Sequence, residues 1–154
     1  MMQIRTQKYA EIAYPLVANM KVNKEFKQTD PEKYKRQYEL QNEYRTQALN
    51  LPTMILQSGL AQSIGFLMAK AKNDSSEAKA KTKAFQKLLE HLEKLLKDSV
   101  KPNKTLHETI LESDIVQYQR LTRNAIEASS WLKRYTQALL EKDKKQEQNN
   151  ATDA

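Results

Sequence analysis

The sequence stretch that decides the fold is residues 51–71, which read LPTMILQSGLAQSIGFLMAKA. It starts beside a proline, continues with apolar residues at helical spacing, and contains both glycines of the chain. Pro52 fits the first turn of a helix, where its missing N–H would have no partner, and it disfavours helical geometry at Leu51. We therefore predict that one helix ends near Asn50 and that a central core helix begins at Pro52.

Gly59 lies inside this predicted core helix. A glycine in a helix interior costs about 1 kcal/mol relative to alanine unless close packing requires it, so we expect Gly59 to be a contact point between helices. On a helical wheel Phe66 lies well away from the main apolar face, so the helix should pack on two sides, with Gly59 and Phe66 as packing or interface candidates. The main face consists of Leu56, Leu60, Ile64, Leu67 and Ala71.

Composition predicts an all-α protein. Two glycines and four prolines in 154 residues leave little material for the turns of an all-β fold. We expect a compact bundle of about six helices in a single domain over residues 1–142. Residues 143–154 hold no large apolar side chain, which indicates a flexible, disordered polar tail. The absence of cysteine removes disulfides and thiolate metal sites and suits a reducing cytoplasm, where we expect the protein.

Capping residues mark most of the remaining helices. Asp30 and Pro31 supply an N-cap and a first-turn proline, and Thr105 followed by Glu108 matches a capping box. Asp114 can cap the last helix. The expected ranges are 3–21, 30–50, 78–97 (after caps offered by residues 73–76), 105–113 and 115–142.

Catalytic chemistry has little support in the sequence. The two histidines, His91 and His107, lie in different predicted helices and match neither a Glu-x-x-His di-iron pair nor a His-Glu-x-x-His zinc helix. Gly59 and Gly65 do not form a phosphate loop, since no strand precedes them. We therefore predict no catalytic residue, no metal and no cofactor. Polar residues such as Gln57 interrupt residues 51–71, so no membrane span is expected either.

Positive charge combined with aromatic residues is the strongest functional signal. The net charge of +7 favours a polyanionic partner. In the last helix Arg120, Arg123 and Arg134 project opposite the apolar face, close to Glu127. Trp131 leaves the centre of the apolar stripe, so two interpretations stay open: it closes the edge of the core, which we favour, or it faces a nucleobase or another chain.

For Arg45 and Lys70 two interpretations likewise stay open: a contact within the chain, or a contact with a phosphate. Arg45 shares a helix sector with apolar residues, where a charge needs a partner: a glutamate of the same chain, or a phosphate held between helices. Lys70 either complements the negative end of its helix or reaches a phosphate. We interpret the densest basic run as a solvated face in the first place, as charge runs usually are, with a binding surface as the alternative. It consists of Lys70, Lys72, Lys79, Lys81, Lys83 and Lys87.

The ordered set of short motifs resembles the small all-helical subunit of type III-B CRISPR effectors, the Cmr complex. The resemblance covers most of residues 1–142, and its most specific part is the pairing of the proline-led central segment with the Trp-Leu-Lys-Arg run near the end. The motifs are residues 7–10 (QKYA), Tyr44, 51–52 (LP), 58–60 (SGL), 66–70 (FLMAK), Tyr118, 125–126 (AI) and 131–135 (WLKRY).

This resemblance implies a non-catalytic subunit of an RNA-guided antiviral ribonucleoprotein. Its expected partners are the other Cmr effector subunits, copies of itself stacked along the filament, crRNA and target RNA. Lys70, Lys133 and Arg134 lie in the matching motifs and become candidates for RNA contact, whereas Gly59 and Trp131 become packing or interface positions. Arg45, Arg120 and Arg123 join the RNA-binding candidates on charge and position alone.

A helical adaptor is the alternative function. In that interpretation an exposed apolar and tyrosine surface recognises a protein, and the basic charge serves solubility without any nucleic-acid contact.

Overall fold

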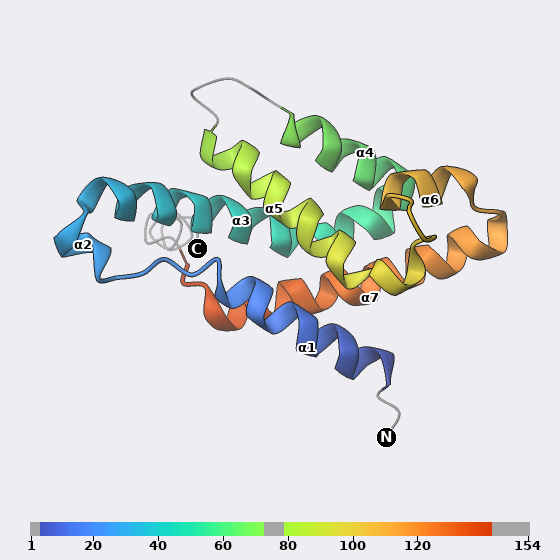
Figure 1. The fold of residues 1–154 in the computed structure, drawn as a ribbon, viewed down its shortest axis with the longest axis horizontal. Coiled ribbons are helices and arrows are strands. Elements are labelled where there is room, and N and C mark those ends of the chain that lie inside the picture. Colours follow the sequence, from blue (N-terminus) through green and yellow to red (C-terminus); the bar gives the residue numbers. More distant parts are fainter. Residues whose placement is uncertain (1–3, 73–78, 143–154) are drawn as a thin grey trace, which may run out of the picture.

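A computed structural model describes residues 4–72 and 79–142 of the chain, and within these ranges all regular structure is helical. Figure 1 shows the arrangement. The expected all-α bundle is confirmed, whereas the predicted tail over 143–154 and the caps at 73–76 lie outside the described residues. The elements are α1 (Arg5–Ala18), α2 (Phe26–Thr29), α3 (Pro31–Ser58), α4 (Leu60–Ala71), α5 (Lys79–Leu95), the 3-10 turn η2 (Lys97–Ser99), α6 (Leu106–Glu112) and α7 (Ile115–Leu139).

The long helix α3 organises the packing. It lies against α7, α5 and α4, while α1 packs along α7. In the view of Figure 1, α4 and α7 lie on opposite sides of α5. Burying a large aliphatic side chain contributes about 1.5–3 kcal/mol, so the shared core of these helices is the main source of stability. Its largest fully buried side chains include Tyr44, Leu51, Leu67, Phe85, Leu88 and Leu132.

The predicted helix boundary at Asn50 and Pro52 is wrong. Helix α3 continues through Pro52 and ends at Ser58, and the chain breaks at Gly59. An interior proline costs about 3 kcal/mol, because it removes a hydrogen bond and crowds the preceding turn. Leu51 and Ile55 are buried on one face of α3 on either side of that proline, and their burial offsets the cost of continuing the helix.

The break also changes which residues of the 51–71 segment are buried. Leu56, predicted on the buried face, is 73% exposed because it belongs to α3, whose buried residues here are Leu51 and Ile55. Helix α4 starts again at Leu60 with its own phase. Leu60, Ile64 and Leu67 are buried, as the helical wheel predicted for them.

Gly59 is required by the backbone at this break. Its φ of 86° and ψ of 161° fall in a region that is essentially confined to glycine. A Cβ atom at Gly59 would meet the hydroxyl of Tyr118 at 3.5 Å, an ordinary van der Waals distance. The expectation of a glycine inside a continuous helix is therefore wrong. Gly59 separates two helices, and a glycine is needed there because other residues rarely adopt this backbone conformation.

Replacing Gly59 with alanine should lower the free energy of unfolding by about 1–3 kcal/mol, the cost of a side chain in this backbone region. Gly65 provides a matched control, because it lies within α4 and a Cβ there would have nothing within 4 Å. Gly65→Ala should raise stability by about 0.5–1 kcal/mol. Urea unfolding of both variants measures the difference. Equal effects of the two substitutions would contradict the conformational argument.

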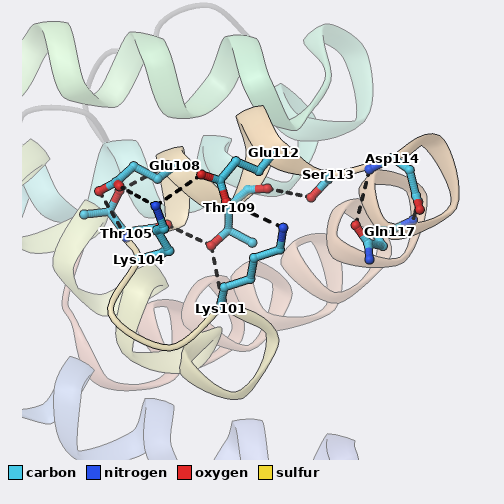
Figure 2. A network of polar contacts seen from close by, with 9 residues as sticks. All are labelled: Lys101, Lys104, Thr105, Glu108, Thr109, Glu112, Ser113, Asp114 and Gln117. Carbon is cyan, nitrogen blue, oxygen red and sulfur yellow. Dashed lines mark hydrogen bonds and ion pairs between the residues drawn. The ribbon is translucent and has the colours of Figure 1, made fainter.

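The predicted helix starts at Asp30, Thr105 and Asp114 are confirmed by their capping hydrogen bonds. The Asp30 carboxylate accepts from the backbone N–H of Lys33 at 3.2 Å. Figure 2 shows the Thr105–Glu108 capping box and the Asp114–Gln117 contacts that open α6 and α7. Helix α7 ends at Leu139, earlier than predicted, because Leu140 takes extended backbone angles. Within the described ranges every helix is too short or too polar to span a lipid bilayer.

Candidate nucleic-acid interface

The outer face of α7 carries a row of cations. Its buried residues pack towards α3 and α1, which leaves the opposite face to solvent, with Arg120, Arg123 and Arg134 exposed and Lys133 half-buried at the margin. Arg123 and Arg134 are eleven positions apart, about 16 Å along the helix axis. The row is thus long enough to lie along several nucleotides of an extended strand.

The only carboxylate within α7 is neutralised by α1. Glu127 lies between the arginines along the helix, and its Oε2 accepts from the guanidinium of Arg5 at 2.8 Å. The hydroxyl of Thr6 donates to the other carboxylate oxygen. Because Arg5 compensates the charge of Glu127, that carboxylate does not cancel the charge of the neighbouring arginines.

The ion pairs of the described residues use other cations. None of Arg120, Arg123, Lys133 and Arg134 is joined to a carboxylate within the part of the chain that the structure describes, so their charge is available to an external anion. The paired cations are Arg5, Lys8, Lys24, Lys87, Lys94, Lys101 and Lys104.

In the loop before α6, by contrast, the lysines are paired with carboxylates of the same chain. Figure 2 shows Lys101 and Lys104 directed at glutamates of α6, with Lys104 Nζ 3.2 Å from Glu112 and Lys101 Nζ 3.6 Å from it. The hydrogen bond from Lys104 and the charges of both lysines hold the pKa of Glu112 below its usual value. The hydroxyl of Thr109 accepts from the backbone N–H of Lys101. These two lysines therefore stabilise the loop and add little free positive charge.

An aromatic cluster flanks the cationic row at the edge between α1 and α7. Trp131 is half-buried, packs against the core and lies 5.5 Å from the ring centre of Tyr135. Tyr135 in turn meets Tyr14 of α1 edge to face at 5.4 Å, and Tyr14 is 51% exposed. Trp131 therefore has intramolecular partners at the core edge, and Tyr14 is the member of the cluster with the most surface left for a base or another chain.

Arg45 lies on α3 and contacts the C-terminal end of α7. Its half-buried guanidinium donates to the main-chain carbonyl of Leu140 at 3.4 Å, next to a hollow of about 490 Å³ at the end of α7. The partner that the structure gives Arg45 is thus a backbone oxygen, where the sequence suggested a glutamate or a phosphate. The contact ties α3 to the residue that ends α7.

Lys70 and Phe66 form a third location, on α4. The Lys70 ammonium lies 5.7 Å from the centre of the Phe66 ring, in the last turn of the helix. Phe66 is 40% exposed and meets the buried Phe85 edge to face at 5.7 Å. The six cationic candidates therefore come from three helices: four lie on α7, Lys70 lies on α4, and Arg45 lies on α3 at the C-terminal end of α7.

Sequence reasoning missed a buried polar pair. The hydroxyl of Tyr44 and Nδ1 of His91 are 2.7 Å apart in the core between α3 and α5. Burial lowers the pKa of His91 to about 4 and raises that of Tyr44. Their spacing of 47 positions carries no sequence signal. In the described ranges no group of three or more histidines and carboxylates could hold a metal ion.

Comparisons with known proteins identify relatives over nearly the whole described chain. The family described as "CRISPR-associated protein (Cas_Cmr5)" matches residues 5–139. The CRISPR system Cmr subunit Cmr5 of Thermus thermophilus is 34% identical over 99 residues, covering 64% of this chain and 76% of that protein. An X-ray crystal structure of a CRISPR-associated Cmr5 family protein from the same organism superimposes with a TM-score of 0.61 at 27% identity, covering 91% of this chain and all of that one.

Proposed function

The chain belongs to the Cas_Cmr5 family of CRISPR-associated proteins, and from this premise we propose that it is a non-catalytic structural subunit of a type III-B Cmr complex that stacks along the filament and contacts the backbone of crRNA or target RNA. Its other partners would be further Cmr subunits and copies of itself, in the reducing cytoplasm. The single observation that carries the RNA contact is the α7 row, whose cations have no intramolecular carboxylate partner among the described residues.

The chemistry of the α7 row suits a phosphate backbone. Arginine and lysine on a rigid helix contact phosphates through charge and hydrogen bonds without reading base edges. Binding should therefore tolerate any sequence, and pairing with the guide would supply specificity. Single-stranded RNA would follow the helix from Arg120 towards Arg134, with Tyr14 and Trp131 beside it as surfaces on which a base can stack.

Stacking with neighbouring subunits has a separate structural basis. Large apolar side chains are exposed at the corner between α6 and α7: Leu111 at 70%, Ile115 at 73% and Val116 at 60%. The first turn of α7 lies against the start of α4, where the Tyr118 hydroxyl accepts from the backbone N–H of Ala61 at 3.1 Å. Exposed apolar side chains gathered in this way are typical of protein contact surfaces.

Charge reversal on α7 tests the proposed RNA contact. In a complex assembled with the Lys133→Glu/Arg134→Glu variant, RNA retention in moderate salt should fall severalfold, because two attractive charges become repulsive. Helicity and subunit assembly should remain, since Arg134 is exposed and Lys133 lies at the margin of the exposed face of α7. Lys101→Gln, which removes a lysine already paired with Glu112, is the control and should leave retention unchanged.

Unchanged retention by the α7 variant would favour the adaptor alternative, for which the exposed apolar corner is the supporting observation. In that case Ile115→Ser/Val116→Ser should release the protein from its partner subunits, while the charge reversal has no effect.

A further inference from the structure

A groove between α3 and α5 is lined by four cations. Lys33 and Arg36 lie on one wall, in the first two turns of α3, and Lys79 and Lys83 lie on the other, at the start of α5. The groove encloses about 600 Å³, and all four cations are exposed. Residues three or four positions apart on a helix are neighbours about 5–6 Å apart, so each wall presents two adjacent charges.

The charge of this groove is not balanced by its own lining. Glu39 is the one carboxylate among the described lining residues, against four cations. None of the four forms an ion pair with a described carboxylate. Lys33 is instead held by its ammonium lying 4.3 Å from the centre of the Phe26 ring, a contact that leaves its charge in place. The net positive charge thus calls for an anion from outside.

The lining of the groove does not suit a protein partner that binds through apolar anchors. Among the described lining residues, Leu40 is the one large apolar side chain, and it is half-buried. Protein interfaces draw most of their binding energy from aromatic or large apolar anchors in well-packed pockets, and the described lining offers only the half-buried Leu40. A partner held here must gain its affinity from charge along its length, which is a property of a phosphodiester chain.

We propose that the α3/α5 groove is a second RNA-binding surface, which holds the backbone of single-stranded RNA between Lys33 and Arg36 on one side and Lys79 and Lys83 on the other. The identity of the polyanion rests on the proposed function. The location does not, because the groove shares no residue with the α7 row. Two such surfaces allow one subunit to hold two segments of RNA.

The test uses the full chain and a fluorescent 20-nucleotide oligouridine, with binding followed by anisotropy from 50 to 300 mM salt. Each phosphate contact adds about 0.7 to the slope of log affinity against log salt for a single strand. Arg36→Gln/Lys83→Gln should therefore reduce the slope by about 1.4 and lower affinity about 20-fold at 0.1 M salt. Lys33→Gln/Lys79→Gln removes the other two charges and should do the same.

The matched control is Lys27→Gln/Lys97→Gln, which removes the same net charge from exposed residues outside the groove. If a groove variant changes the slope no more than this control, the groove proposal is overturned. If labelled decaglutamate loses binding in the groove variants while the RNA slope stays unchanged, the partner is an acidic protein and the proposal is also wrong.

A third variant, Lys133→Gln/Arg134→Gln, separates the groove from the α7 row. If only the α7 variant lowers the salt slope, the groove proposal is wrong and the proposed function is retained. A slope lowered only by the groove variants supports the groove and rejects the α7 row. No measurable binding of oligouridine by the unaltered chain at 50 mM salt would overturn both.

Discussion

Lowering the pH from 7 to 4 should remove about 3 kcal/mol of folding free energy through one residue, His91. Burial lowers the pKa of His91 to about 4 from its ordinary value of 6.5. One pKa unit corresponds to about 1.4 kcal/mol, which gives this magnitude. His91 is 4% exposed and bonded to the hydroxyl of Tyr44, so its protonation would place a charge in the core beside a neutral partner.

Proton binding by His91 determines whether stability rises or falls with pH. Between pH 6.5 and 4 the unfolded chain binds a proton at His91 that the folded chain does not, so stability falls as the pH falls through this window. Well above pH 6.5 the imidazole is neutral in both states, so burial of His91 carries no proton-linked cost. Carboxylates held below their usual pKa, such as Glu90 beside Lys94, add further loss at lower pH.

The double variant Tyr44→Phe/His91→Leu isolates this effect. Replacing both partners of a buried hydrogen bond with apolar groups of similar shape can be nearly neutral at pH 7. Urea unfolding at pH 7, 5.5 and 4 should show the double variant losing about 3 kcal/mol less than the unaltered protein. Removing His91 takes away one of the smaller charge contributions that lower the pKa of Glu90, but the main partner of Glu90, Lys94, remains in both proteins. Equal losses would therefore contradict the assigned role of His91.

Phe85→Ala should lower the free energy of unfolding by about 3–5 kcal/mol, the cost of truncating a phenylalanine in a tightly packed core. Phe85 is 2% exposed on α5 and meets Phe66 of α4 edge to face. The substitution leaves a cavity between these helices and removes the aromatic contact. Thermal or urea unfolding gives the difference.

Phe66→Ala provides the matched control in the same aromatic pair. Phe66 is 40% exposed, so its truncation should cost about 1 kcal/mol through the lost ring contact and a smaller loss of buried area. If Phe66→Ala destabilises as strongly as Phe85→Ala, the assignment of Phe85 to the core and Phe66 to its edge is wrong. A small effect leaves Phe66 available as an interface residue.

Local sequence signals predicted the helix starts well. Asp30, Thr105 and Asp114 cap helices as expected, because an N-cap depends on a side chain and a backbone N–H only a few residues away. The apolar spacing likewise predicted an all-α bundle, since helical periodicity is a property of each segment by itself.

The boundary between α3 and α4 could not be predicted from local signals. Pro52 is a stronger local signal for a break than Gly59, but burial of Leu51 and Ile55 keeps the helix intact at the proline. The same error placed Leu56 on the buried face. Tertiary packing decided between two competing local preferences.

The charge state of the α7 row also depends on contacts between distant positions. Glu127 is paired with Arg5, 122 positions away, and Arg45 bonds the carbonyl of Leu140, 95 positions away. Sequence spacing identified the arginines as exposed. Only the packing of α1 on α7 shows that the carboxylate among them is already neutralised.

The salt dependence of RNA binding by the unaltered full chain tests the central claim most directly. Contact of the α7 row with about three to five phosphates of single-stranded RNA predicts that log affinity falls with log salt at a slope of about −2 to −3.5, with no preference among unstructured sequences. Contacts in the α3/α5 groove would make the slope steeper still. A slope near zero, or no binding even at 50 mM salt, would contradict the claim that exposed, unpaired cations on helices hold an RNA backbone.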